Sequence, residues 1–166
     1  MRHSDSFQGR ITRRSFSIGA IALLTAPMAV RAQEAHKATL WKKGDPGERL
    51  LVSGRIVGPD NQPVGGAQIH VRQANGAGVY TAGYSTTLVS APDGKYELRT
   101  ALPGQYGPAK HIHVNIAHPD YQPVYTEILF KLDPKGTGAE NEILLEEAHF
   151  GGNLVWVGTF NVVLQK

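Results

Sequence analysis

Two histidines separated by one residue form the most informative motif of the chain, in the segment His111-Ile112-His113-Val114. Side chains on a β-strand point alternately to opposite faces, so the two imidazoles would share one face and the isoleucine between them the other. Strand residues spaced in this way lie about 7 Å apart along the backbone, close enough for both rings to bind one metal ion. Imidazole suits iron, zinc, copper and nickel, so the pair alone does not identify the metal. The alternative is a pair of solvated histidines on an outer sheet face.

Tyrosines are the candidate oxygen donors near this pair. Tyr106 precedes His111 in a loop rich in Gly and Pro, and the stretch from Tyr80 to Tyr84 follows a turn at 75–78. A free tyrosine has a pKa of about 10, but a hard trivalent ion can displace the phenolic proton by its own charge, as metal ions do for water and thiols. Phenolate together with imidazole therefore favours Fe(III) over zinc. Composition leaves open which of the six tyrosines take part.

Other tyrosines and histidines are expected to have structural roles. Tyr96 alternates with charged residues on an expected strand and should lie in the core, whereas Tyr121 and Tyr125 flank Pro123 and could simply pack. The histidines that remain after residue 32 are isolated in the sequence and are expected to be structural or solvated: His36, His70, His118 and His149.

The composition excludes several kinds of site. The 166 residues include no cysteine, which rules out disulfides, thiolate zinc sites, iron–sulfur clusters and cysteine nucleophiles. The formal net charge of +3 is concentrated at the N-terminus, where residues 1–32 hold five arginines and one acidic residue. The rest of the chain has 12 basic and 13 acidic residues, a net charge of −1, so nucleic acid is not an expected partner.

Residues 1–32 have the features of an export signal of the twin-arginine type. Arg13 and Arg14 precede an apolar run from Ile18 to Val30, and Ala32 fits cleavage after a small residue. The run is too short to span a bilayer comfortably. The mature protein is therefore expected in the periplasm or outside the cell, with no membrane attachment after cleavage. A generic secretory signal and a buried helix are the alternatives.

Short strands and turns fill most of the remaining sequence. Residues 33–50 show no stable period and predict an N-terminal arm. From residue 51 onward, β-branched runs alternate with turns rich in Gly, Pro and Asp. Residues 136–149 are expected to form a loop or a short helix. The fold class is therefore all-β, a small β-sandwich of the prealbumin or immunoglobulin type with long loops, as one domain over residues 51–166. The expected strands are 51–57, 67–73, 95–100, 111–117, 124–130 and 154–164.

Four stretches match a known family in the same order along the chain. They are Gly54-Arg55-Ile56-Val57 with Pro63-Val64-Gly65-Gly66-Ala67; Gln73-Ala74-Asn75 leading to Tyr80; Asp93-Gly94-Lys95-Tyr96 leading to Pro103-Gly104-Gln105-Tyr106; and His111-Ile112-His113-Val114. On these motifs the chain from about residue 51 to residue 164 resembles the catalytic domain of intradiol ring-cleavage dioxygenases, the protocatechuate and catechol dioxygenase family. The last stretch is the most specific of the four.

The resemblance implies an Fe(III) site whose metal ligands are Tyr80, Tyr106, His111 and His113. It also implies that a small aromatic diol of the catechol type reacts with O2, and that cleavage between the two hydroxyl groups gives a cis,cis-muconate-type diacid. In this family the second tyrosine leaves the metal when substrate binds and accepts a substrate proton. Tyr106 is therefore expected to be both a metal ligand and the catalytic base.

The chain departs from the family pattern around the expected ligands. Pro108 stands where the family usually has an arginine close to the substrate, Arg72 replaces a tryptophan, and Glu127 and Leu129 replace a Gln-x-Tyr pair. Lys110 and Glu127 are the residues expected to contact the substrate. Changes around metal ligands can alter activity substantially. The resemblance therefore supports iron binding more directly than efficient cleavage of ordinary catechol.

Differences in length from the larger family members lead to further expectations. The loop between Tyr106 and His111 is shorter, which predicts an open pocket suited to bulky aromatic substrates. No helical N-terminal domain of the kind that dimerises catechol dioxygenases is expected, and the sequence leaves open whether the protein forms a homo-oligomer. A different class of function is a non-catalytic prealbumin-like β-sandwich that binds ligands through the same side chains. A third alternative is a degenerate family member that keeps iron.

Overall fold

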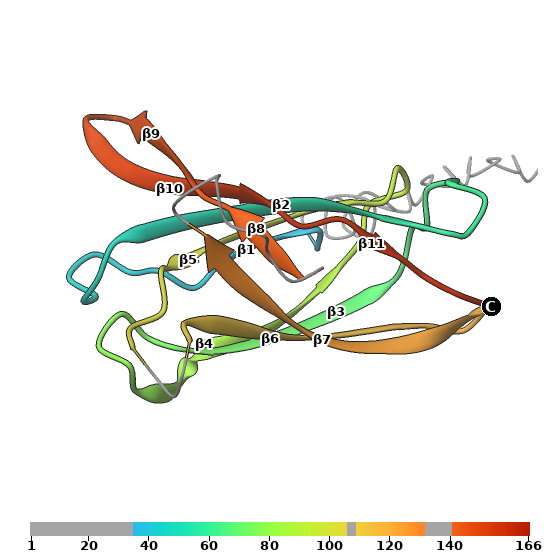
Figure 1. Ribbon diagram of the computed structural model, residues 1–166, viewed down its shortest axis with the longest axis horizontal. Coiled ribbons are helices and arrows are strands. Elements are labelled where there is room, and N and C mark those ends of the chain that lie inside the picture. Colours follow the sequence, from blue (N-terminus) through green and yellow to red (C-terminus); the bar gives the residue numbers. More distant parts are fainter. Residues whose placement is uncertain (1–34, 106–108, 132–140) are drawn as a thin grey trace, which may run out of the picture.

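The computed structural model describes residues 35–105, 109–131 and 141–166 (Figure 1). Within these ranges the chain forms eleven β-strands and no helix. The strands are β1 (Lys37–Thr39), β2 (Arg49–Val57), β3 (Gln68–Ala74), β4 (Tyr80–Val89), β5 (Lys95–Ala101), β6 (His111–His118), β7 (Tyr121–Lys131), β8 (Glu142–Leu144), β9 (Glu146–Phe150), β10 (Asn153–Thr159) and β11 (Val162–Val163).

The strands form two sheets that pack face to face, as Figure 1 shows. The first sheet has the order β1-β5-β2-β10-β9, with β11 also paired to β2, and the second has the order β4-β3-β6-β7-β8. Strand β1 runs parallel to β5, and β10 and β11 run parallel to β2, whereas the pairs β2–β5 and β9–β10 are antiparallel. This arrangement confirms the expected all-β sandwich.

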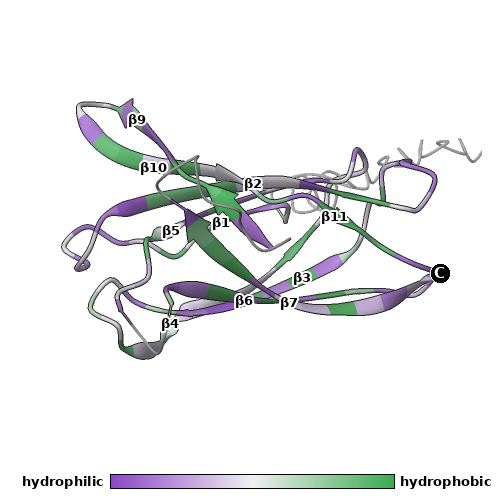
Figure 2. Ribbon diagram, viewed as in Figure 1, coloured by the Kyte–Doolittle hydropathy of each residue, from purple (hydrophilic) through white to green (hydrophobic). Residues whose placement is uncertain are grey.

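Alternation along the strands turns the apolar face of each sheet toward a common core. In β6 the side chains of Ile112, Val114 and Ile116 are at most 1 % exposed. Figure 2 shows hydrophobic residues recurring along strands of both sheets. The opposite face of β6 carries His111 and His113, which are half-buried. Both imidazoles therefore share the outer face of the second sheet, as the alternation predicts.

A buried amide ties the two sheets together close to the histidine pair. Gln73 of β3 is 1 % exposed, and its Nε2 donates to the carbonyl oxygens of Ala74 and Ala101 at 3.0 and 2.8 Å. Its Oε1 accepts a hydrogen bond from Thr100 Oγ1 at 3.0 Å. A buried amide without partners would destabilise the fold. The network both satisfies Gln73 and holds β3 against β5 of the other sheet.

The expected N-terminal arm, residues 33–50, contains regular structure in its described part, residues 35–50. Its strand β1 lies parallel to β5, and two backbone hydrogen bonds flank the pairing: Glu97 N donates to His36 O at 2.8 Å and Leu40 N donates to Arg99 O at 2.7 Å. Strand β2 also begins within this segment, at Arg49. Strand β1 is stabilised by a strand far along the chain and carries no local periodicity of its own.

Within the segment 136–149, expected to be a loop or a short helix, the described residues form strand β8 and most of strand β9. Strands β9 and β10 are joined as a hairpin at Gly151 and Gly152, whose φ angles of 56° and 78° suit a two-residue hairpin turn.

The expected strand 154–164 is divided into β10 and β11 at Phe160 and Asn161. The carbonyl of Phe160 there accepts a hydrogen bond of 2.7 Å from the hydroxyl of Tyr96.

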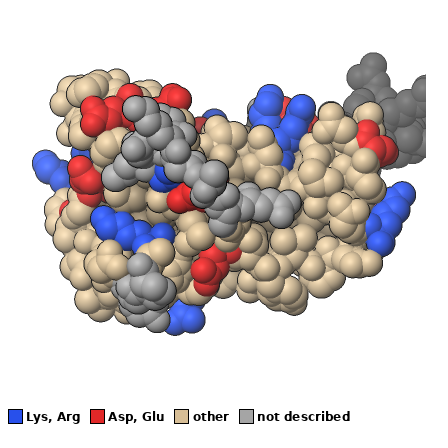
Figure 3. Space-filling view, viewed as in Figure 1, with Lys and Arg blue, Asp and Glu red and all other residues tan. Residues whose placement is uncertain are grey.

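Several predictions fall on residues outside the described ranges. They concern the export signal at 1–32, Tyr106, Pro108 and residues 136–140. No helix in the described part of the chain is long and apolar enough to cross a membrane. On the face shown in Figure 3, basic and acidic side chains are interspersed.

Candidate metal centre

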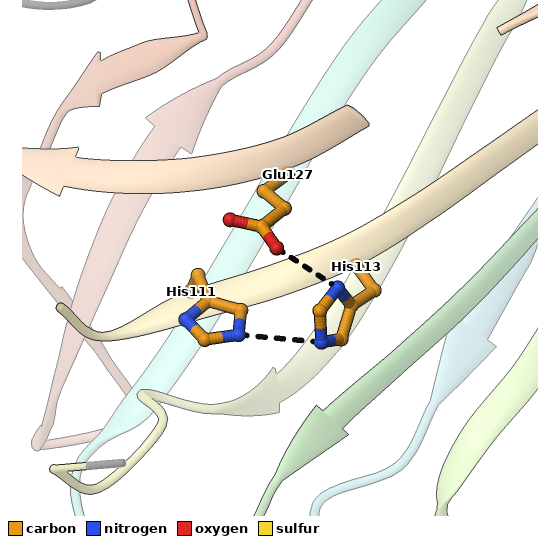
Figure 4. A group of neighbouring side chains, drawn as sticks. All are labelled: His111, His113 and Glu127. Carbon is orange, nitrogen blue, oxygen red and sulfur yellow. Dashed lines mark hydrogen bonds and ion pairs between the residues drawn. The ribbon is translucent and has the colours of Figure 1, made fainter. Parts of the chain in front are cut away.

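The two histidines of β6 bring their ring nitrogens together near the beginning of the strand. Nε2 of His111 lies 3.3 Å from Nε2 of His113, and the ring centroids are 4.6 Å apart (Figure 4). The geometry follows from the local sequence, because the apolar residues that alternate with the histidines are buried in the core. The structure thus brings together the two predicted nitrogen ligands.

A phenol oxygen joins the two nitrogens. Tyr80 is the first residue of β4, and its hydroxyl lies 3.0 Å from Nε2 of His113. Ligand atoms bound to one ion at about 2.0–2.1 Å lie about 3 to 3.5 Å from one another. The observed separations of 3.0 and 3.3 Å fall in that range. Three donor atoms therefore have the spacing of ligands around a single metal ion.

The second nitrogen of each ring faces an oxygen acceptor. His113 Nδ1 lies 3.2 Å from Oε1 of Glu127, and His111 Nδ1 lies 2.9 Å from the carbonyl oxygen of Ala109. An Nδ1–H that donates to these oxygens leaves a lone pair on each Nε2. With that tautomer the two Nε2 atoms present lone pairs 3.3 Å apart, an arrangement that a metal ion between them would stabilise. The residues present therefore fit a metal ion.

Glu127 reaches His113 because the two residues are directly paired between β6 and β7. Side chains of such a pair lie close together on the same face of the sheet. Figure 4 shows that the carboxylate and His111 meet different nitrogens of the His113 ring. The donor atoms of His111, His113 and Glu127 all lie within 4.8 Å of one another. Glu127, expected to contact substrate, thus contacts one of the predicted ligands.

The centre is open to solvent. The side chain of His113 is 42 % exposed and that of Glu127 is 44 % exposed, so a small molecule can approach the donor atoms. Lys110, the other residue expected near the substrate, is exposed and directly precedes His111. Burial of this degree is compatible with substrate binding at the surface of the second sheet.

The loop before Tyr80 is organised by Asn75. Its side-chain Oδ1 accepts hydrogen bonds from the backbone N–H groups of Ala77 and Val79, both at 3.0 Å. Its carbonyl oxygen accepts from the N–H groups of Gly78 and Gly104, both at 2.9 Å. The bond to Gly104 connects the loop that leads into Tyr80 with the segment that leads to Tyr106. Asn75 therefore holds in place the backbone on the N-terminal side of both predicted phenol ligands.

Glycines allow these two loops to approach closely. A Cβ atom on Gly104 would lie 2.5 Å from the carbonyl oxygen of Gly76 and would overlap the backbone nitrogen of Gly78. Gly78 itself has a φ of +80°, a backbone conformation that favours glycine. Any larger residue at Gly104 would push the loop of Tyr80 away from its neighbour.

Two other tyrosines are accounted for by hydrogen bonds outside the centre. The hydroxyl of Tyr84 donates to Oδ2 of Asp45 at 2.9 Å, and burial together with this bond raises the pKa of Tyr84 to about 12. Burial also raises the pKa of Tyr96, which lies in the core as expected and donates to the carbonyl of Phe160. Both phenols are therefore held neutral and away from the histidine pair.

The remaining aromatic and imidazole side chains that the sequence singled out lie elsewhere. Tyr121 packs edge-on against His118, with ring centroids 5.3 Å apart, whereas Tyr125 is 75 % exposed. Nε2 of His70 lies 3.3 Å from Oγ of Ser85. Among the residues that the structure describes, the cluster of His and Glu side chains around His113 includes neither His70 nor His118.

Two contacts of the centre were missed by sequence reasoning. They are the bond between Glu127 and His113, and a stacking contact of Arg72 on the ring of Tyr80. The first depends on the direct pairing of His113 with Glu127 between β6 and β7, and the second on the pairing of β3, which carries Arg72, with β4, which begins at Tyr80. The available signal was that both residues depart from the family pattern at positions close to the expected ligands.

Comparison with known proteins places the chain among oxygenases. A family described as Dioxygenase matches residues 25–139, more than half of the chain. A hydroxyquinol 1,2-dioxygenase of Rhizobium sp. is 33 % identical over 93 residues, which cover 48 % of this chain and 32 % of the relative. The matched segment therefore spans about a third of the length of that relative.

Solved structures share the fold. Catechol 1,2-dioxygenase from Acinetobacter sp. ADP1 superposes with a TM-score of 0.70 at 20 % identity, over 79 % of this chain and 57 % of that one. The dioxygenase domain of a dioxygenase–carbohydrate-binding fusion protein from Streptomyces sp. SirexAA-E gives a TM-score of 0.63 at 29 % identity. That match covers 76 % of this chain and 86 % of the domain.

Proposed function

The chain belongs to the intradiol dioxygenase family, and from this membership we propose that it cleaves a catechol-type aromatic diol with O2 between the two hydroxyl groups. The proposed product is a cis,cis-muconate-type diacid. The observation that carries the proposal is the convergence of Nε2 of His111, Nε2 of His113 and the hydroxyl of Tyr80, at separations of 3.3 and 3.0 Å.

The proposed cofactor is Fe(III), held by Tyr80, Tyr106, His111 and His113. Two neutral imidazoles and two phenolates combine nitrogen donors with hard oxygen donors, which suits a trivalent ion. When bound, Fe(III) supplies Lewis acidity, which favours the deprotonated diol and its reaction with O2. Of the four proposed ligands, Tyr106 lies outside the described residues and rests on the resemblance alone.

The residues around the ligands have separate tasks in this proposal. Glu127 and the carbonyl of Ala109 accept hydrogen bonds from the two Nδ1–H groups and keep both Nε2 atoms aimed at one point. Asn75 holds the loop from which Tyr80 begins β4. These contacts orient the donor atoms before any ligand binds, so little rearrangement is needed.

Tyr106 is the proposed base. Its phenolate oxygen accepts a proton from one substrate hydroxyl as the diol takes its place, so an O–H bond of the diol breaks and an O–H bond forms on Tyr106. Tyr80 keeps its position beside His113. The open surroundings of His113 support a substrate larger than catechol, because more than a third of this side chain stays exposed.

Oxygen uptake by the iron-loaded protein tests the proposed function. The substrates are catechol, hydroxyquinol and 3,4-dihydroxybenzoate, and the products are analysed by mass spectrometry after reaction with isotopically labelled O2. The expected result is a ring-opened diacid that contains both oxygen atoms of one O2 molecule. Protein that is colourless and free of iron after expression in iron-replete cells, and that consumes no O2, would favour the non-catalytic binding module instead.

We also propose that residues 1–32 direct export of the folded protein to the periplasm or beyond. The support is the paired Arg13 and Arg14 ahead of an apolar run. Fractionation of cells that express the full chain, with Arg13→Lys and Arg14→Lys introduced together, provides the test. The expected result is a mature exported protein in the wild type and an unprocessed cytoplasmic protein in the double variant.

A further inference from the structure

A guanidinium group lies beside the candidate centre on the outer face of the second sheet. Arg72 of β3 is paired across the strands with His113 of β6, and His113 is paired in turn with Glu127 of β7. Directly opposite residues of neighbouring strands point to the same side, so the three side chains form a row. The row places a cation on one side of His113 and a carboxylate on the other.

The guanidinium of Arg72 stacks on the ring of Tyr80. Its Cζ atom lies 4.8 Å from the ring centroid, within the about 6 Å over which an aromatic face attracts a cation. The hydroxyl of the same tyrosine contacts His113. Arg72 therefore contacts the ring of Tyr80, whereas the hydroxyl oxygen of Tyr80 is the atom that contacts His113.

The charge of Arg72 has no acidic partner among residues 35–105, 109–131 and 141–166. The ion pairs in those ranges join other residues, and Glu127 pairs with His113. Arg72 is also exposed, so its N–H groups are accessible to an anion that arrives from solvent. Guanidinium binds a carboxylate through two parallel hydrogen bonds, which the single ammonium of lysine does not reproduce.

We propose that Arg72 selects diols that carry a carboxylate on the ring, an inference that rests on the proposed function of the same site. The guanidinium lies over a ring face beside the converging donor atoms, so it is placed to bind a substituent of the substrate rather than its reacting hydroxyl groups. The family pattern has an uncharged tryptophan at this position. Arg72 is thus a specificity-determining residue of this chain.

The test compares 3,4-dihydroxybenzoate with catechol, which differ by the carboxylate. Anaerobic titration of the iron-loaded protein measures the Kd of each diol without turnover, and oxygen uptake measures kcat/KM. Arg72→Gln should weaken binding of 3,4-dihydroxybenzoate, and lower its kcat/KM, by about 10- to 100-fold. The Kd and the kcat/KM for catechol should stay within about twofold of the wild-type values. Arg72→Lys should recover part of the loss, because it restores the charge without the planar fork.

A matched control is available in the other sheet. Arg49 of β2 also stacks on an aromatic ring, with its Cζ 3.9 Å from the centroid of Trp41. Arg49→Gln removes an equal charge from an equivalent contact. It should leave the ratio of the Kd values of the two diols, and the ratio of their kcat/KM values, unchanged. Equal losses for both diols in Arg72→Gln, or no loss for 3,4-dihydroxybenzoate, would overturn the proposal.

Failure of the proposed function has a different signature. In that case the wild-type protein would cleave neither diol, with or without the carboxylate. The anaerobic titration still decides the role of Arg72, because it measures binding alone. Tighter binding of 3,4-dihydroxybenzoate than of catechol, lost in Arg72→Gln, supports the role, and equal binding of both diols contradicts it.

Discussion

Nδ1 of His113 lies 3.2 Å from Oε1 of Glu127, while the other nitrogen of the same ring faces His111. A carboxylate in this position fixes the tautomer and the orientation of a metal-binding histidine and makes it a stronger donor. Glu127 of β7 is therefore expected to influence how strongly His113 of β6 binds a metal ion.

Replacement of Glu127 should weaken metal binding without removing a ligand. Glu127→Leu is expected to lower the affinity for Fe(III) by about 10- to 100-fold, because the His113 ring loses the acceptor that orients it. Glu127→Gln keeps an oxygen acceptor and should lose less. Chelator competition measures the affinity, and a shift of the phenolate-to-iron absorption band reports the altered ligand independently of turnover. Equal affinity and an unshifted band in Glu127→Leu would remove the assigned role.

Variants at the ligands should separate metal binding from catalysis. His113→Ala is expected to lose the iron, because it deletes the nitrogen that lies close to both other donor atoms. Tyr106→Phe is expected to retain iron through three ligands but to slow ring cleavage by about 10²- to 10⁴-fold, since the proposed base is absent. Metal analysis and oxygen uptake on the same preparations measure the two effects. An unaltered rate in Tyr106→Phe would show that another group accepts the proton.

A methyl group at Gly104 should disturb the loop of Tyr80. Gly104→Ala would bring Cβ to 2.5 Å from the carbonyl oxygen of Gly76, and the expected destabilisation is about 1–3 kcal/mol together with weaker iron binding. Urea unfolding and chelator competition measure these effects. Gly83→Ala in β4 is the control, because the nearest atom to its Cβ is 3.9 Å away. Its stability should change by no more than about 0.5 kcal/mol, and similar results for both variants would contradict the packing argument.

Alkaline pH should destabilise the fold through Tyr84. Burial, followed by the hydrogen bond and charge of Asp45, raises the pKa of Tyr84 to about 12 from its ordinary 10.0. Above pH 10 the unfolded chain loses this proton while the folded chain keeps it, so the free energy of unfolding falls between pH 10 and 12. Urea unfolding across this range should show a shallower fall in Tyr84→Phe. The remaining fall is expected from Tyr96, whose pKa burial also raises.

The matched control for this pH dependence is Tyr125→Phe. Tyr125 is 75 % exposed, so its phenol experiences similar solvent in the folded and unfolded chains. The variant should retain the full alkaline fall of the wild type. If the free energy of unfolding fell equally steeply with pH in Tyr84→Phe and in the wild type, Tyr84 would not contribute to the alkaline destabilisation.

Local patterns were sufficient to predict the sandwich and part of the centre. Alternation of apolar residues locates β3, β5 and β6, and in β6 it also places both imidazoles on one face. Tyr80, identified through the family motifs, lies 3.0 Å from His113. Tyr106 stays a prediction, because it lies outside the described residues.

Contacts between strands could not be predicted in the same way. The partner of His113 depends on the register of β6 and β7, and a shift by one residue would turn Glu127 to the opposite face. That register contains an irregularity between Ile116 and His118, which local propensity does not reveal. The strands β1 and β8 also escaped prediction, because each is short and is stabilised by a parallel partner elsewhere in the chain.

The pairing of Lys37–Thr39 with Glu97–Arg99 also bears on where the proposed export signal could be removed. Strand β1 covers the border of the first sheet, and an uncovered border offers free backbone groups to a strand of another molecule. Proteolysis a few residues beyond the expected cleavage point would therefore expose β5 to intermolecular pairing. Cleavage at the proposed point, after Ala32, would leave β1 in place on that border.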